Sequence, residues 1–212
     1  MNGRRDFLKT SALISGAALV NSLPFSSAYA AGSDQIKVAV VGCGGRGTGA
    51  AFDALNSGFN LKIVALCDAF KDNLDRAHAS LKERFPDKVD VSDSRKYVGF
   101  EGYKSAIADA DVVILATSPG FRPIHFEEAV RQGKHVFMEK PVAVDIPGVR
   151  KVLAAAQIAK QKKLNVVVGL QRRYQTNYRE AIKRIQDGAI GDIVSGQVYW
   201  NSGGVWVRPR QP

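Results

Sequence analysis

The sequence predicts an α/β fold: a doubly wound parallel sheet, followed by the start of a second α/β domain. Over residues 36–170, short runs of continuous apolar residues alternate with longer segments of helical periodicity. This alternation is typical of parallel strands that are buried on both faces and connected by right-handed helical crossovers. The first apolar run leads directly into a glycine-rich turn, and no internal repeat or low-complexity tract interrupts the pattern.

The expected elements follow from where apolar runs, glycines and prolines stand. Strands are expected where the residues are almost continuously apolar, at 36–41, 61–66, 97–98, 111–117, 135–138 and 166–170. Helices are expected where apolar residues recur every three to four positions, at 47–55, 72–85, 103–108, 124–132 and 147–161. Pro86 and Gly133 end two of these helices.

The pattern changes after residue 170. Residues 174–186 predict a helix that stops at Gly188, and residues 193–200 alternate like a half-buried strand. Because a single strand cannot bury its apolar face alone, residues 171–212 are interpreted as the truncated start of a second domain. The chain would then be a fragment of a longer protein.

The first thirty residues predict an export signal. Arg4 and Arg5 precede Phe-Leu-Lys, a weakly apolar run of about ten residues follows, and Ala-Tyr-Ala at 28–30 has the small residues of a cleavage site. Paired arginines are typical of the twin-arginine route, and the apolar run is too short to span a membrane as a helix. We expect a periplasmic or otherwise extracytoplasmic protein after removal of residues 1–30; a basic disordered tail is the alternative.

Composition is that of an ordinary globular protein. The chain has 212 residues, 45% of them hydrophobic and 24% charged, with a formal net charge of +10. The basic residues are not interleaved with aromatics, so nucleic acid is not expected as a partner. Cys43 and Cys67, the two cysteines, are interpreted as small buried residues, with a disulfide between neighbouring strands as the alternative. No metal site is expected from them.

The turn at residues 42–47 reads G-x-G-x-x-G between a strand and a helix. Gly42 permits the tight turn, Gly44 lets the backbone approach a pyrophosphate, and Gly47 lets the helix pack closely on the strand. The N-terminus of the following helix offers unpaired N–H groups to phosphates. The turn therefore predicts a dinucleotide-binding site at residues 31–170, the first domain.

Asp68 follows the second strand at the distance that such a site requires. Its carboxylate can accept hydrogen bonds from an adenosine ribose and would repel a 2′-phosphate, which favours NAD over NADP. Lys71 lies close enough in the sequence to weaken that preference. The alternative role of Asp68 is to cap a helix.

Glu139 and Lys140 follow the strand expected at 135–138, at the sheet edge where open α/β folds bind ligands. A lysine there can position a substrate hydroxyl or help to move its proton. A solvated surface pair is the alternative.

Several of these segments together resemble the glucose-fructose oxidoreductase and inositol dehydrogenase family. They are G-C-G-G-R-G at 42–47, G-K-H-V at 133–136, E-K-P at 139–141, R-R-Y at 172–174 and G-A-I-G-D-I at 188–193. The resemblance implies a Rossmann domain followed by an α/β domain with an open, mostly antiparallel sheet. It also implies homo-oligomers and substrates that are sugars, cyclitols or their derivatives.

The resemblance implies that Lys140 is catalytic, contacting the nicotinamide ribose and the substrate, and that Glu139 lies against the cofactor. The glycine-rich turn, the acid after the second strand and the resemblance together predict one set of cofactor-binding residues. These residues are Gly42, Gly44, Gly45, Arg46, Gly47, Asp68, Thr117, Ser118, His125, Glu139 and Lys140.

The loop at 117–125 departs from the family pattern T-P-x-x-x-H-P-x-H. Arg122 stands where a histidine is common, whereas His125 matches the second histidine. Arg122 is either a contact for an acidic or phosphorylated substrate or a solvated loop residue. His125 either packs on its helix or lies near the nicotinamide, while His78 and His135 are interpreted as structural.

Arg172 and Tyr174, at the domain junction, are further candidates for substrate contact. The family's acid/base element, D-x-x-x-H in the second domain, does not occur before Pro212. The sequence thus predicts an exported NAD-dependent oxidoreductase with a tightly held cofactor and a polyol substrate, its catalytic set incomplete within these residues. The alternatives are a glycoside hydrolase that uses bound NAD transiently and a non-catalytic cofactor- or partner-binding protein.

Overall fold

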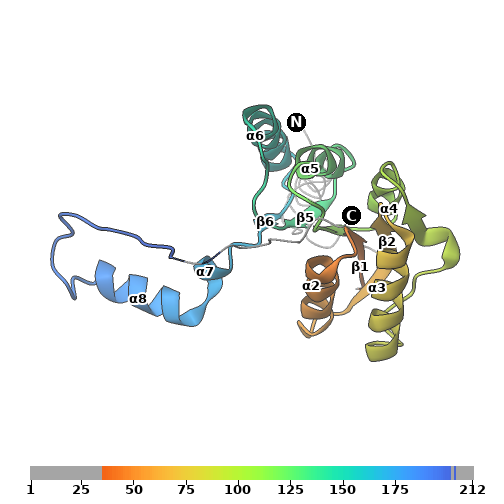
Figure 1. Cartoon of the computed structure of the whole chain (residues 1–212), viewed down its shortest axis with the longest axis horizontal. Helices are drawn as coiled ribbons and strands as arrows, with labels where there is room; N and C mark the ends of the chain where they lie inside the picture. Colours follow the sequence, from red (N-terminus) through yellow and green to blue (C-terminus); the bar gives the residue numbers. More distant parts are fainter. Residues whose placement is uncertain (1–34, 202, 204–212) are drawn as a thin grey trace, which may run out of the picture. The chain divides into compact units, whose positions relative to one another are not determined.

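The computed structural model of the chain describes residues 35–201 and 203, drawn in colour in Figure 1. The chain divides into two compact units, Met1–Val168 and Gly169–Pro212. The described part of the first unit holds a six-stranded sheet and its covering helices. The predicted export signal at 1–30 lies outside the described residues.

The sheet is entirely parallel, with the strand order β3-β2-β1-β4-β5-β6. Its strands are β1 Ile36–Val41, β2 Leu61–Asp68, β3 Lys96–Val98, β4 Val112–Leu115, β5 His135–Met138 and β6 Val166–Val168. β1 is the axis, because its residue Val41 lies opposite both Cys67 of β2 and Leu115 of β4. The reversal of strand order at β1 confirms the predicted doubly wound topology.

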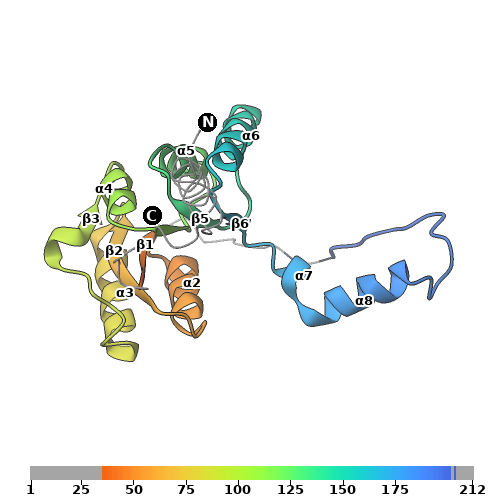
Figure 2. The ribbon, with the colours of Figure 1, turned by 180° about the vertical axis from the view of Figure 1, so that it is seen from behind.

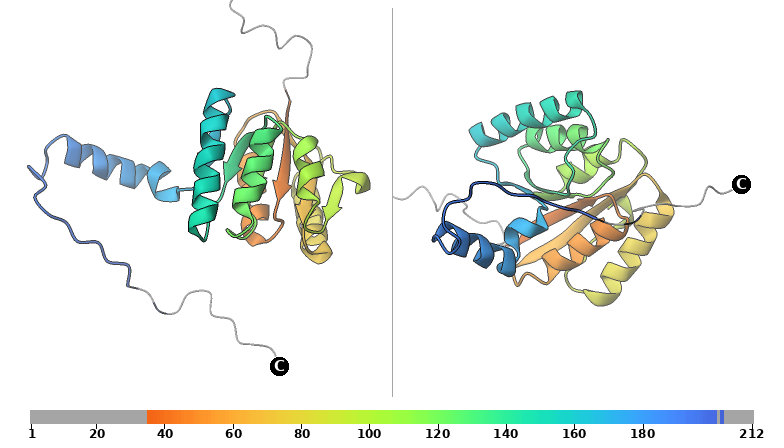
Figure 3. Two further views of the ribbon diagram at one scale, coloured as in Figure 1. Left: turned by 90° about the horizontal axis from the view of Figure 1, so that it is seen from above. Right: turned by 60° about the vertical axis from the view of Figure 1, so that its left-hand side comes forward.

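Helices cover both faces of this sheet, α2 and α3 on one face and α4, α5 and α6 on the other (Figures 1, 2 and 3). They are α2 Gly45–Leu55, α3 Lys71–Arg84, α4 Tyr103–Ala108, α5 Arg122–Arg131 and α6 Ile146–Gln161, with a short 3₁₀ turn, η2, at Asp93–Arg95. The unit is therefore a three-layer α/β structure.

β1 supplies side chains to both cores in alternation. Val38 and Val40 belong to the core under α2 and α3, whereas Ala39 and Val41 belong to the core under α4, α5 and α6. All four are at most 3% exposed. The continuous apolar run in the sequence thus reflects a strand that is buried on both faces.

Three element boundaries differ from the prediction where it matters for function. β2 continues to Asp68, so the acid ends the strand instead of following it. α2 begins at Gly45, because its first turn is rich in glycine and hides the helical pattern. α5 begins at Arg122 instead of residue 124, since Pro123 suits the first turn of a helix, where no N–H is needed.

The second unit contains two helices, α7 Gln171–Tyr174 and α8 Thr176–Gln186, in place of the single helix predicted at 174–186. Gln175 separates them with an extended backbone, φ −68° and ψ 131°. None of the helices within residues 35–201 is both long and apolar enough to cross a membrane.

The strand predicted at 193–200 is wrong. These residues have no regular structure, and Val194 and Val198 are 94% and 97% exposed. A strand needs a neighbour for its backbone groups and an apolar surface under its side chains, and the described part of this unit provides neither. The antiparallel sheet that the resemblance implies is not seen in these residues.

Candidate functional site

The loops that follow β1, β2, β4 and β5 all lie at the carboxyl edge of the sheet, around the point where the strand order reverses. Open α/β sheets bind their ligands at such a point. The predicted site residues of the first unit lie in these loops, in the helical turns that begin there or, for Asp68, at the last position of β2. The topology therefore gathers them at one edge.

The glycine-rich turn contains two kinds of glycine. Gly42 has φ +96°, and a Cβ there would lie 2.6 Å from the Thr117 nitrogen; a Cβ on Gly47 would lie 1.7 Å from the Gly42 oxygen. Both must be glycine for the turn to close. A Cβ on Gly44 or Gly45 would meet nothing within 4 Å, so this side of the turn is open.

The open side of the turn is also the N-terminus of α2. Gly44 is the N-cap and has no side chain to bond the first N–H groups, and the first turn contains no acidic residue. These N–H groups and the positive end of the helix dipole suit an anion such as a phosphate. The turn therefore fits the pyrophosphate of a dinucleotide.

Asp68 is 8% exposed and bonds to the turn. Its Oδ2 accepts the Cys43 N–H at 2.6 Å, and its Oδ1 accepts the Phe70 N–H at 2.9 Å. The alternative role of Asp68 as a helix cap is wrong. The N-cap position of α3 is occupied by Phe70, and α3 has no side-chain capping bond. The carboxylate lies between the glycine-rich turn and the β2–α3 connection.

Two polar residues of α3 that the sequence did not single out form a chain of bonds that ends at Asp68. Asn73 Nδ2 lies 3.4 Å from Asp68 Oδ1, and Arg76 Nη2 donates to Asn73 Oδ1 at 2.6 Å. Arg76 thus sets which end of the Asn73 amide faces Asp68. Their spacing of three residues on one face of α3, just after the acid, was the signal that could have found them.

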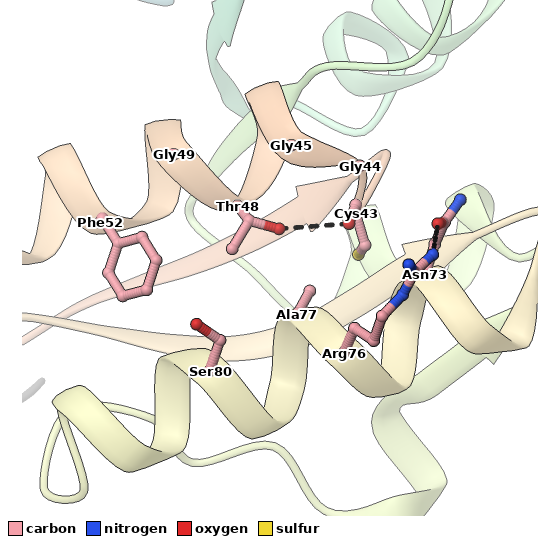
Figure 4. Close-up of a pocket in the computed structure, with 10 residues that line it drawn as sticks. All are labelled: Cys43, Gly44, Gly45, Thr48, Gly49, Phe52, Asn73, Arg76, Ala77 and Ser80. Atoms are coloured by element: carbon pink, nitrogen blue, oxygen red, sulfur yellow. Dashed lines mark hydrogen bonds between the residues drawn. The ribbon is translucent and has the colours of Figure 1, made fainter.

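A cavity of about 400 Å³ lies beside the turn, and its lining residues come from α2, α3 and the turn itself (Figure 4). Its lining residues are Cys43, Gly44, Gly45, Thr48, Gly49, Phe52, Asn73, Arg76, Ala77 and Ser80. The open glycines form its upper end, so the cavity is continuous with the phosphate side of the turn.

The two cysteines are free and buried, as the preferred interpretation stated. Cys43 Sγ lies 3.4 Å from the Cys67 carbonyl oxygen. Burial, together with the nearby Asp68, raises the pKa of the Cys43 thiol and brings the pKa of Cys67 to about 12. Neither thiol is a nucleophile at neutral pH.

His125 packs inside its helix region and is 4% exposed. Its ring centroid lies 4.3 Å from that of Tyr103, and its Nδ1 is 3.1 Å from Thr117 Oγ1. Burial, and then the charge of Arg122, lower the pKa of His125 to about 4. The imidazole is therefore neutral at pH 7, so it contributes no charge to the loop after β4.

Arg122 is not a solvated loop residue; that interpretation is wrong. It is 2% exposed, and its two terminal nitrogens donate to the backbone oxygens of Thr117 and Pro141. The alternative role as a substrate contact is also unsupported, because these donors face the protein. The sequence could not show this, since the partners are backbone groups of two separate loops.

Glu139 and Lys140 differ sharply in their surroundings. Glu139 is 8% exposed and its Oε1 accepts a hydrogen bond from Arg46 Nε at 2.7 Å, whereas Lys140 is exposed. The alternative of a solvated surface pair therefore fails for Glu139. The bond between Arg46 and Glu139 joins the turn after β1 to the loop after β5.

Two exposed phenylalanines that were not singled out lie at the same edge. Phe100 and Phe121 are 65% and 41% exposed, and their rings stack with centroids 5.6 Å apart. The residue before Phe100, Gly99, donates its N–H to the Asp68 carbonyl oxygen at 2.9 Å. An exposed flat apolar surface thus begins beside the strand that ends in Asp68.

Arg172 and Tyr174 belong to the second unit. Arg172 Nη1 donates to Gln175 Oε1 at 3.0 Å, and its guanidinium lies 5.0 Å from the ring centre of Tyr178. Their suggested contact with a substrate stays a prediction. Of the other histidines, His135 accepts the Asn165 N–H at 2.9 Å. Within the described residues no three metal-ligating side chains come together.

The part of the chain that carries this sheet edge is similar to proteins of known family. Residues 36–170 match the model of an oxidoreductase family with an NAD-binding Rossmann fold. An inositol 2-dehydrogenase of Gluconacetobacter diazotrophicus is 31% identical over 63% of this chain and 36% of that protein. A glycosyl hydrolase family 109 protein of Shewanella pealeana is 26% identical over 93% of this chain and 45% of that protein.

Among solved structures, scyllo-inositol dehydrogenase from Lactobacillus casei, with bound NAD(H) and scyllo-inositol, is similar with a TM-score of 0.59. It is 27% identical, over 74% of this chain and 43% of that chain. The chain thus spans between about a third and a half of the length of these relatives. The matched segment contains the whole sheet and the glycine-rich turn, so NAD is the dinucleotide that this turn fits.

Proposed function

The chain belongs to the Gfo/Idh/MocA oxidoreductase family, and from that premise we propose that it is an NAD-dependent oxidoreductase acting on a sugar or cyclitol. One observation carries the proposal: the bond from Arg46 to Glu139 brings the glycine-rich turn and the loop with Lys140 together at one sheet edge. The turn offers a place for the dinucleotide, and Lys140 offers an exposed cation beside it.

We assign the adenosine half of NAD to the turn and to β2. Gly44 and Gly45 leave space for the pyrophosphate, and Asp68 would accept hydrogen bonds from the ribose hydroxyls. The Asp68 carboxylate would repel a 2′-phosphate, and Lys71 does not offset this repulsion because its ammonium pairs with Asp75. The charge of Asp68 therefore favours NAD over NADP.

The nicotinamide half is assigned to the loops after β1, β4 and β5, through Arg46, Thr117, Ser118, His125 and Glu139. Of these, Arg46 and Ser118 are exposed, and the other three are buried or half-buried. The exposed groups can contact a ligand, whereas the buried ones hold the loops in place. Because His125 is neutral, the buried charged side chains of the loops after β4 and β5 are Glu139 and Arg122.

Bound NAD supplies the carbon that accepts a hydride when an alcohol is oxidised. The alcohol also loses its hydroxyl proton, and Lys140 would hold that hydroxyl and share the proton. We expect the residue that finally accepts the proton to belong to the second domain, as the resemblance implies.

The substrate class rests on similarity. The inositol dehydrogenases among the relatives are named for a cyclitol, and the solved structure contains scyllo-inositol. We propose a hydroxyl-rich ring of this kind for the present chain. A homo-oligomer is proposed for the whole protein on the resemblance alone.

We also propose export by the twin-arginine route to the periplasm, which rests on the pattern at residues 1–30. This route carries proteins that are already folded. Because no free pool of NAD exists outside the cytoplasm, the cofactor would leave already bound. One substrate would then reduce the cofactor that another oxidises.

The test is to purify the exported protein without added cofactor, denature it, and quantify the NAD, NADH and NADP released. We expect close to one NAD(H) per chain, and turnover of paired oxidised and reduced sugars. Absence of dinucleotide would contradict tight binding. Release of sugar from an aryl glycoside without net NADH would replace the proposal with a glycoside hydrolase, and bound NAD without any turnover would leave a non-catalytic protein.

A further inference from the structure

Arg122 is the largest side chain in the fully buried set of the described residues, 2% exposed. It stands at the first position of α5, where the helix dipole disfavours a cation. Charged side chains are almost never fully buried unless they are paired. The position therefore needs an explanation that helix formation does not supply.

Its partners are backbone oxygens on two different loops. Nη1 donates to the Pro141 carbonyl, in the loop after β5, and Nη2 donates to the Thr117 carbonyl, in the loop after β4. A planar guanidinium can reach two acceptors at once with fixed geometry, which a lysine ammonium cannot do as well. Backbone bonding between the two segments includes the bond from the Glu139 N–H to the Leu115 oxygen at 3.0 Å, and Arg122 adds a side-chain link further along both loops.

The third nitrogen of the guanidinium, Nε, also indicates that the two carbonyls decide where the side chain lies. Nε of Arg122 is buried and has no partner among the described residues. A buried donor without a partner is unfavourable, so the side chain is not placed to satisfy all its nitrogens. The two carbonyls determine its orientation.

The charge of Arg122 acts on its neighbours as well. Glu139 is the carboxylate that stabilises the guanidinium charge, and it is also bonded to Arg46. The charge of Arg122 also acts on His125, whose imidazole bonds to Thr117. A fixed positive charge next to this ring opposes its protonation.

We infer that Arg122 is a positioning residue: it locks the Glu139–Pro141 turn to the Thr117 loop and thereby fixes Lys140 between them. It acts through the backbone. The role of Lys140 rests on the proposed function, whereas the locking of the two loops does not. The Arg122 charge also adds, after burial, to the lowering of the His125 pKa, which gives the inference a second readout.

Two substitutions separate the geometry from the charge. Arg122→Gln removes both the positive charge and the planar group that reaches two carbonyls at once. Arg122→Lys keeps the charge but loses that two-acceptor geometry. Arg131→Gln is the matched control, because Arg131 is exposed at the other end of α5 and pairs only with Glu128 on its own helix.

The first measurement is amide hydrogen exchange of residues 139–145, and the second is the pKa of His125 by NMR. We expect exchange to rise about tenfold in both Arg122 variants and not in Arg131→Gln. The pKa of His125 should rise above about 4 in Arg122→Gln but stay low in Arg122→Lys. Unchanged exchange in both Arg122 variants, or an unchanged His125 pKa in Arg122→Gln, would overturn the inference.

Circular dichroism shows whether each variant is folded. If Arg122→Gln does not fold, the amide hydrogen exchange of Arg122→Lys alone tests the inference. In turnover, Arg122→Lys should lower kcat about tenfold and leave the amount of NAD(H) bound per chain unchanged. Absence of turnover in the unchanged protein would instead count against the proposed function and leave the exchange result intact.

Discussion

The carboxylate of Asp68 holds the glycine-rich turn, because its Oδ2 atom lies 2.6 Å from the backbone nitrogen of Cys43. The acid at the end of β2 therefore shapes the turn after β1 as well as facing the proposed ribose site. The other oxygen, Oδ1, has one strong bond, from the Phe70 N–H, and a long contact with Asn73. The shape of the glycine-rich turn and the proposed binding of NAD therefore both depend on the Asp68 side chain.

Replacing Asp68 with asparagine should weaken NAD binding more than it weakens the fold. The amide oxygen can still accept the Cys43 N–H, but the charge is lost. Since a hydrogen bond to a charged group contributes about 1.5–3 kcal/mol, we expect NAD affinity to fall about tenfold to a hundredfold. The preference for NAD over NADP should narrow, as titration calorimetry with both cofactors would show. Asp72→Asn, an exposed acid on α3, is the control, and an unchanged cofactor preference in Asp68→Asn would contradict the assignment.

The two kinds of glycine should behave differently when alanine replaces them. Gly47→Ala places a Cβ 1.7 Å from the Gly42 oxygen, so we expect a loss of about 3 kcal/mol in unfolding free energy. Gly44→Ala meets no atom within 4 Å, so the variant should fold normally yet bind NAD weakly. Urea unfolding and NAD titration of both variants test this. A stable Gly47→Ala, or full NAD binding by Gly44→Ala, would be the contrary outcome.

His125 should make the fold sensitive to acid. Its pKa is lowered from 6.5 to about 4 in the folded chain, so the unfolded chain binds the proton first as pH falls. The contribution is fully present above pH 6.5 and is lost as pH falls towards 4; its size is about 3 kcal/mol. Unfolding free energies at pH 7 and pH 4.5 should show the loss, and His125→Asn should flatten it. His78→Asn, which removes a partly exposed histidine, should keep most of the dependence.

Lys140→Met should lower turnover without releasing the cofactor. The substitution keeps the apolar stem of an exposed side chain and removes its charge. Loss of a group that holds and shares a proton lowers kcat by about a hundredfold. Steady-state kinetics of the whole protein, with NAD release measured alongside, test this expectation. Lys151→Met, at a partly exposed lysine of α6 that pairs with Glu127, should be neutral; equal effects of the two substitutions would remove Lys140 from the mechanism.

The sheet could be predicted from the sequence because its strands are buried on both faces. The run at 36–41 and the strand at 135–138 were predicted to the residue, since continuous apolar residues between turn signals have few other interpretations. Helix starts were predicted less well at α2 and α5, where glycine and proline obscure the periodicity. The strand expected at 193–200 failed because alternation alone does not make a strand without a partner.

The site was predictable where a residue's role depends on its place in the chain. Gly42, Gly47 and Asp68 lie where the motif requires them. Arg122 was not predictable, because its partners are carbonyl groups of two loops that meet only in the folded chain. Asn73 and Arg76 were missed because polar residues on the first two turns of a helix are usually solvated.

The sharing of β1 between the two cores has a thermodynamic consequence. Val38 and Val40 belong to one apolar cluster, and Ala39 and Val41 belong to the other. Neither layer of helices can detach without exposing one face of this central strand. We therefore expect the unit to melt in one cooperative transition, with equal calorimetric and van't Hoff enthalpies. A half-melted intermediate would keep only one face of β1 covered and would have no stable strand at its centre.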